Sequence, residues 1–97
     1  MNIVAVDIGN TNVAVGLFLD GKEKSIESLP GVGEAQVRDC LISAWEKIPV
    51  LETSTEGKRN GVIVVSSVKP AWTELVRKVA EDDLHEKIHV IGEDVPL

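Results

Sequence analysis

Two apolar segments near the N-terminus are separated by only a short polar turn, and this arrangement constrains the fold more than any other feature. Residues 2–8 are rich in Val and Ile, as is typical of a buried strand. Residues 12–19 form a second such segment, and Asp20-Gly21 follows it. Both Asp and Gly tolerate the positive φ angles of a two-residue hairpin turn. With residues 22–28 as a third, more polar strand near an edge, the chain is predicted to begin with an antiparallel meander.

The periodicity of apolar residues becomes helical after Pro30-Gly31, a pair that breaks regular structure. One apolar stripe predicts a helix from about residue 34 to residue 48, ended by Pro49. The stripe consists of Val37, Leu41, Trp45 and Ile48. A polar loop is expected over residues 52–60.

The second half of the chain repeats the strand and helix pattern. Residues 61–66 are strongly β-branched and predict a strand buried on both faces. Pro70 suits the first turn of a helix, where its missing N–H is not needed. The buried stripe of that helix is predicted to be Trp72, Leu75, Val76, Val79 and Ala80. Residues 87–91 predict a fifth strand.

The predicted order is therefore β-β-β-α-β-α-β in one α/β domain over residues 1–97. The first, fourth and fifth strands should pair in parallel through right-handed helical crossovers. The second and third strands should extend the sheet in antiparallel fashion. We expect a ribonuclease H-like half-domain with a mixed five-stranded sheet.

Composition excludes several classes of function. The formal net charge is -6 and the sequence pI about 4.8, which argues against nucleic acid and anionic membrane surfaces as partners. No apolar run reaches the roughly 18–20 residues that span a bilayer. Cys40 is the one cysteine among 97 residues, so no intrachain disulfide can form. These features favour a reduced, cytoplasmic setting.

The run from Asp7 to Asn12 is the strongest candidate for chemistry. Asp7 is placed at the carboxyl end of the first predicted strand, and Gly9 is expected to let the chain reverse tightly. Asn10, Thr11 and Asn12 bring short polar side chains and exposed N–H groups to the bend. Such a bend can bind an anion, and a nearby carboxylate can hold Mg²⁺ directly or through water. Phosphoryl transfer depends mainly on positioning and charge neutralisation, which these groups can supply.

The alternative interpretation of this run is a plain hairpin whose Gly-Asn pair only supplies turn geometry. Two features favour a binding site instead. Asp7 interrupts an apolar strand, where a buried carboxylate without a partner would be costly. The turn also contains more consecutive small or polar residues than a tight reversal requires.

Three segments of the sequence together resemble the type III pantothenate kinase family. Asp-Ile-Gly-Asn-Thr-Asn at 7–12 is similar to the first phosphate motif of that family. Residues 65–70, Val-Ser-Ser-Val-Lys-Pro, are similar to its Ser-Ser-Val-x-Pro segment after the fourth strand. Residues 91–96 are similar to its run after the fifth strand. The family belongs to the acetate and sugar kinase, Hsp70 and actin superfamily.

The resemblance implies ATP-dependent phosphorylation of pantothenate, the first step of coenzyme A synthesis, by a homodimer. Its cofactors would be Mg²⁺ and a monovalent cation, K⁺ or NH₄⁺. Asp7 would be the catalytic, metal-associated carboxylate, and Ser66 and Ser67 would line the substrate cleft. The implied phosphate-binding residues are Asp7, Ile8, Gly9, Asn10, Thr11 and Asn12, with Val13 and Ala14 at the far edge.

One departure from the family pattern limits this assignment. Family members are more than twice this length, and a Gly-x-Asp-Arg motif carries their catalytic base and a substrate-binding Arg. That motif does not occur in these 97 residues. The family base is therefore expected beyond Leu97, and the chain is expected to be the N-terminal half, inactive alone. Alternatives are a kinase of the same superfamily with another acceptor, such as a sugar, or a non-catalytic regulatory or scaffold protein.

A zinc-protease pattern, His-Glu-x-x-His, also occurs at residues 85–89. It works only on a continuous helix, where both His side chains share a face. Because residues 87–91 predict a strand, this interpretation is rejected.

Overall fold

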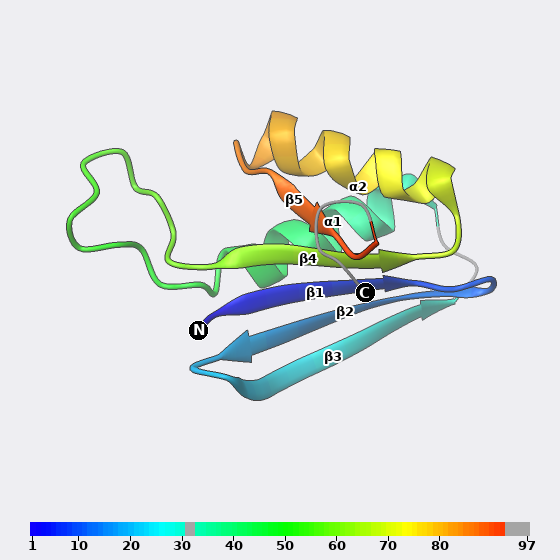
Figure 1. Cartoon of the computed structure of the whole chain (residues 1–97), viewed down its shortest axis with the longest axis horizontal. Coiled ribbons are helices and arrows are strands. Elements are labelled where there is room, and N and C mark those ends of the chain that lie inside the picture. The colour runs from blue at the N-terminus through cyan, green and yellow to red at the C-terminus, as the bar shows by residue number, and fades with distance from the viewer. Residues whose placement is uncertain (31–32, 93–97) are drawn as a thin grey trace.

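The computed structural model describes residues 1–30 and 33–92. These residues form a five-stranded mixed sheet with both helices on one face (Figure 1). The sheet has the strand order β3-β2-β1-β4-β5. The predicted element order and α/β class are confirmed. The elements are β1 (Ile3–Ile8), β2 (Asn12–Leu19), β3 (Lys22–Pro30), α1 (Glu34–Trp45), β4 (Val62–Ser67), α2 (Pro70–Asp83) and β5 (Ile88–Val90).

Strand β1 lies at the centre of the sheet and is paired on both sides. It runs antiparallel to β2 and parallel to β4, and β4 runs parallel to β5. The β2–β3 pair is antiparallel, with an irregularity between Leu17 and Phe18. This topology agrees with the ribonuclease H-like half-domain expected from the sequence, including the edge position of β3.

The core lies between the sheet and the two helices. Alternate residues of β1 point toward the helices, and these residues (Val4, Val6 and Ile8) are almost completely buried. Burial of apolar side chains between the layers is the main source of stability for such a fold. The helices contribute Val37, Leu41, Ala44, Trp45, Val76, Val79 and Ala80.

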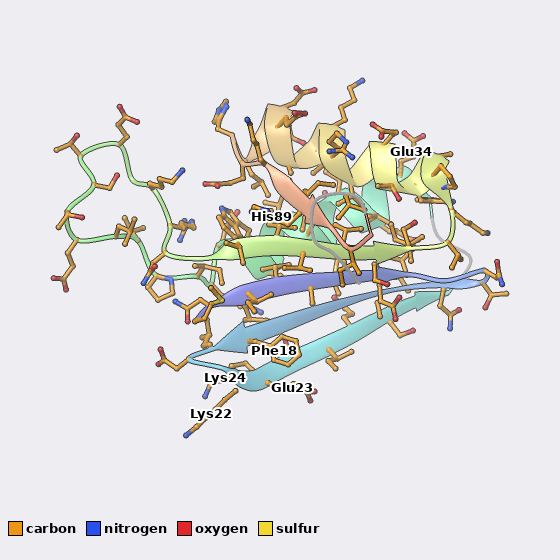
Figure 2. All side chains as sticks on the ribbon, in the orientation of Figure 1. Phe18, Lys22, Glu23, Lys24, Glu34 and His89 are labelled. Atoms are coloured by element: carbon orange, nitrogen blue, oxygen red, sulfur yellow. The ribbon has the colours of Figure 1, made fainter. Side chains whose placement is uncertain are left out.

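The opposite face of the sheet carries no helix among the described residues. In β4, Ile63 and Val65 are buried whereas Val62 and Val64 are only partly buried. The prediction that this strand is buried on both faces is therefore wrong, because α1 and α2 lie on the same side. The register places Phe18 and His89, labelled in Figure 2, on the face without a helix.

Helix α1 ends at Trp45, three residues before the predicted end. The N–H of Ile48 donates to the carbonyl oxygen of Trp45 at 3.0 Å, the spacing of a 3₁₀ turn. The Arg59 guanidinium donates to the carbonyl oxygens of Glu46 at 3.0 Å and Ile48 at 2.8 Å. Ile48 is still fully buried. The apolar stripe was thus identified correctly, but its last member belongs to a tightened turn that Arg59 caps.

The hairpin between β2 and β3 forms as predicted, with φ angles of 54° at Asp20 and 76° at Gly21. The sequence pattern does not reveal the residue that anchors this hairpin. The Asn2 side chain is buried, accepts the Asp20 N–H at 2.9 Å and donates to the Asn60 carbonyl oxygen at 2.9 Å. Asn2 therefore fastens the start of β1 to the hairpin and to the segment entering β4.

Gly61 offers a test of packing between these segments. A Cβ atom at Gly61 would lie 2.9 Å from Cγ2 of Ile48 and 3.0 Å from the backbone oxygen of Asn2. We expect Gly61→Ala to destabilise the fold by about 1–3 kcal/mol, because the backbone or a core side chain must shift. Circular dichroism melting would measure this. The control is Gly9→Ala, where the added Cβ would lie at an ordinary contact distance of 3.5 Å from the Asn12 carbonyl oxygen; equal Tm changes would contradict a packing role for Gly61.

Cys40 on α1 contacts the neighbouring strand β3. Its Sγ donates to Oε2 of Glu27 at 2.9 Å. Burial, followed by the hydrogen bond and negative charge of Glu27, raises the pKa of the Cys40 thiol from 9.0 to about 12. Because the folded pKa exceeds the unfolded one, this effect stabilises the fold below pH 9.0 and is lost as the pH rises toward about 12.

We therefore expect the folded chain to react slowly with iodoacetamide at a pH near the usual thiol pKa, since the thiolate is the nucleophile. Glu27→Gln removes the negative charge beside the sulfur and should speed alkylation. The unfolded chain in denaturant gives the reference rate. A folded protein that reacts as fast as the unfolded chain would show that Cys40 is not protected.

Candidate functional site

The turn between β1 and β2 presents backbone donors at its tip. The N–H of Gly9 donates to the carbonyl oxygen of Asn12 at 2.9 Å and closes the turn. Asn10, Thr11 and Asn12 are exposed. Within the described part of the chain, the N–H groups of Asn10 and Thr11 have no hydrogen-bond partner. These two donors are therefore available to water or to an anion.

Gly9 is not required by the geometry of this turn. Its φ angle lies outside the left-handed region, and an added Cβ would lie 3.5 Å from the Asn12 carbonyl oxygen, an ordinary contact. The chain does reverse at Gly9, but the reversal does not depend on a backbone conformation that favours glycine. What glycine provides here is a backbone surface without a side chain, which allows another group to approach closely.

Asp7 lies on the sheet face opposite the helices and is exposed. The premise that it is a buried carboxylate is therefore wrong, and no burial penalty has to be offset. Asp7 is paired in register with Ala14 on β2 and Ser66 on β4. Among the residues that the structure describes, its carboxylate makes no ion pair. An exposed carboxylate beside a hydroxyl provides the oxygen ligands that Mg²⁺ prefers.

The two adjacent serines of β4 point to opposite faces. Ser66 is exposed on the face of Asp7, whereas Ser67 pairs in register with Ile8 on the helix side. The Ser67 hydroxyl accepts the N–H of Lys69 and donates to the carbonyl oxygen of Lys69, both at 3.0 Å. Of the two, Ser66 is therefore the one placed to contact a ligand beside Asp7.

The remaining predicted residues of the motif contribute mainly through the backbone. Ile8 and Val13 are almost completely buried, with their side chains in the core. Ala14 is partly buried opposite Asp7. None of these three side chains is therefore exposed at the surface as those of Asp7 and Ser66 are.

Two further expectations from the sequence concern the chain after β5. Residues 93–97, which hold most of the run that resembles the family and end at Leu97, lie outside the described residues. The placement of that run beside the turn therefore stays a prediction. The same holds for the family base, which is expected beyond Leu97 and is not among the groups that the described residues bring to Asp7.

The loop after β4 lies against the end of β1. The N–H of Val68 donates to the carbonyl oxygen of Ile8 at 3.0 Å. The turn, Asp7 and Ser66 therefore share one edge of the sheet, at the carboxyl ends of the parallel strands β1 and β4 (Figure 1). This edge is where open α/β sheets commonly bind ligands.

The donor set fits a hydrated Mg²⁺ ion that a bound phosphate shares, because such an ion uses one or two carboxylates and keeps several waters. No cluster of three or more His, Cys, Asp or Glu side chains suited to a metal occurs in residues 1–30 and 33–92. His85 follows α2 with a φ angle of 55°, and His89 lies in β5. They share no helix, so the zinc-protease geometry is not formed.

Three hollows formed by described residues include neither Asp7, Ser66 nor any residue of the turn. They are lined by residues of α1 and α2, by the segment 56–59 and by residues 84–86. Among the described residues, no helix combines the length and the apolar character needed to cross a membrane.

Comparison with protein-family models identifies the family of this chain. A search among curated proteins gave no match. The family model for type III pantothenate kinase, in contrast, matches residues 3–96, which include β1, the turn, the β4 loop and β5. The chain therefore belongs to the type III pantothenate kinase family.

Proposed function

We propose that residues 1–97 form the N-terminal, nucleotide-phosphate-binding domain of a kinase that transfers a phosphoryl group from ATP to pantothenate. The observation that carries the proposal is the juxtaposition of Asp7, Ser66 and two free backbone donors at one edge of the sheet. Membership of the family supports the reaction class and the acceptor. The acceptor is phosphorylated in the first step of coenzyme A synthesis.

In this proposal the turn binds and orients the phosphates. The N–H groups of Asn10 and Thr11 donate to phosphate oxygens, and Gly9 lets the phosphates approach the backbone. Asp7 holds Mg²⁺ directly or through water, and the hydroxyl of Ser66 orients the Asp7 carboxylate or that water. Bound Mg²⁺ neutralises the negative charge that would otherwise oppose transfer.

Activation of the acceptor is assigned to a group that these residues do not supply, because the sequence through Leu97 holds no Gly-x-Asp-Arg motif. The use of K⁺ or NH₄⁺, a homodimeric assembly and a cytoplasmic location are further parts of the proposal that rest on the family alone. Turnover of pantothenate by residues 1–97 alone would contradict this assignment of the base.

Gly9→Ala separates a binding turn from a plain hairpin. The backbone conformation at Gly9 accepts Ala, so the variant should be as stable as the parent or up to about 1 kcal/mol more stable. The added methyl group occupies the surface where the phosphate approaches, so affinity for MgATP should fall by about tenfold, or about 1.4 kcal/mol. Thermal melting and isothermal titration calorimetry measure the two effects. Unchanged affinity would identify the turn as structural only.

Asp7→Asn tests the metal role of the carboxylate. Asp7 is exposed, so the free energy of unfolding should change by no more than about 0.5 kcal/mol. Affinity for ATP should fall about tenfold when Mg²⁺ is present. In EDTA it should not fall, because the Asn side chain lacks the negative charge that repels the phosphates. Asp20→Asn in the distant hairpin is the matched control, since Asn also tolerates the positive φ there. An equal loss with and without Mg²⁺ would contradict a metal role.

A further inference from the structure

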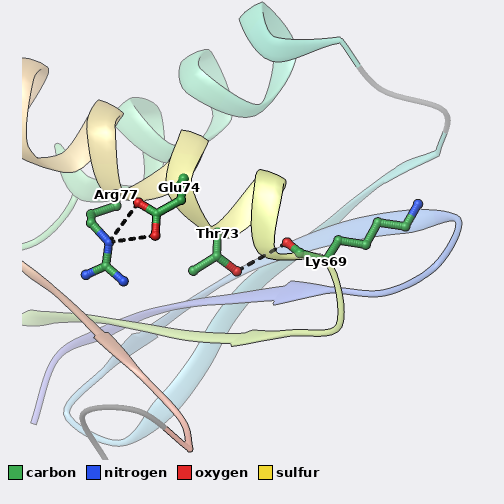
Figure 3. A network of polar contacts seen from close by, with 4 residues as sticks. All are labelled: Lys69, Thr73, Glu74 and Arg77. Carbon is green, nitrogen blue, oxygen red and sulfur yellow. Dashed lines mark hydrogen bonds and ion pairs between the residues drawn. The ribbon is translucent and has the colours of Figure 1, made fainter.

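Lys69 is held at the same edge of the sheet by several hydrogen bonds to its backbone. Its N–H donates to Oγ of Ser67 at 3.0 Å, and its carbonyl oxygen accepts the N–H groups of Trp72 and Thr73 at 3.1 Å each. The Thr73 hydroxyl donates to the same oxygen at 3.3 Å (Figure 3). The preceding residue, Val68, is bonded to the end of β1. The backbone of Lys69 is therefore positioned rigidly beside the β1–β2 turn.

The side chain of Lys69, in contrast, makes no ion pair among the described residues. In the view of Figure 3 it extends from the start of α2 toward the tip of the β1–β2 turn. It carries a positive charge at an edge where Asp7 also has no ion pair within the described part of the chain.

The other cationic side chains lie elsewhere in the fold. Lys22 and Lys24 are at the β2–β3 hairpin, the opposite end of the sheet (Figure 2). Lys58 forms an ion pair with Glu86, and Arg59 caps the turn after α1. Arg38, Lys47, Arg77 and Lys78 lie on or just after the helices, and Lys87 precedes β5. Lys69 is therefore the cation that the described structure places next to the turn.

A cation at this position would change the balance of charge around the turn. The chain has a net charge of -6, and the turn adjoins the Asp7 carboxylate, so a polyphosphate arriving there meets negative charge. Like charges a few ångströms apart repel, and they do so more strongly at a protein surface than in bulk water. Two neutral N–H groups cannot offset the repulsion from several negative charges. A cation beside the turn, such as the ammonium group of Lys69, can offset this repulsion.

We propose that Lys69 is a phosphate-binding residue whose ammonium group contacts the nucleotide phosphates held at the β1–β2 turn. This inference rests on the proposed function of that turn. Lysine suits the position because its ammonium group is a compact charge with three donors on a flexible stem, and it can follow a phosphate without a fixed bidentate geometry.

An acyl-phosphate derivative of ATP tests the placement directly, because it acylates lysine amines that lie close to bound phosphates. With the full chain, we expect acylation at Lys69 that excess MgATP suppresses, read by peptide mass spectrometry. Suppressible acylation at a different lysine would overturn the role of Lys69 and leave nucleotide binding intact. If no lysine is acylated in a suppressible way and calorimetry detects no MgATP binding, the proposed function of the turn fails and the inference fails with it.

Binding by variants provides the second test. Lys69→Met should weaken MgATP binding about tenfold in calorimetry, and Lys69→Arg should retain most of the affinity. Lys78→Met makes the same change of charge on the outer part of α2, where Lys78 lines a hollow with Glu34 and Asp82, and should have little effect. Equal losses of affinity in the two Met variants would show that only the overall charge of the protein matters, and this would overturn the inference. Thermal melting of each variant confirms that the comparison is made between folded proteins.

Discussion

The pairing of β1 with β2 on one side and with β4 on the other is the constraint on which the rest of the molecule depends. Alternate side chains of β1 enter the core, and the set on the opposite face ends with Asp7. The parallel register with β4 brings Ser66 beside that carboxylate. A slip of one residue would move the apolar set of β1 to the open face and Asp7 into the core. The same apolar contacts that stabilise the sheet therefore also determine where the polar edge forms.

At this edge, some polar groups are used in hydrogen bonds within the fold, whereas others remain available to a ligand. Ser67, Val68 and the backbone of Lys69 are used to hold the β4 loop and the start of α2 against β1. The N–H groups at the tip of the turn have no partner within the described chain. Groups that are exposed and unpaired but carried by rigidly bonded segments are suited to bind a ligand with little reorganisation. This combination, more than any single motif residue, supports a phosphate-binding role.

The order of elements and the strand pairing could be predicted because periodicity, turn residues and the short connection between β1 and β2 all act locally. The errors have tertiary causes. Ile48 continues the apolar stripe, but a 3₁₀ turn capped by Arg59 carries it. The β-branched run of β4 suggested two buried faces, yet both helices cover the same one. The roles of Gly9, Asp7 and the two serines depend on register and exposure, which composition and spacing do not specify.

Binding of the MgATP phosphates by the β1–β2 turn is the step on which the proposed function depends. The most direct test is to titrate the ¹⁵N-labelled chain with MgATP and to follow the backbone amide resonances. We expect the largest shifts at Gly9 to Asn12, with a second group at Ser66 to Lys69. Shifts confined to the hollow between α1 and α2, or none at saturating nucleotide, would contradict this role of the turn.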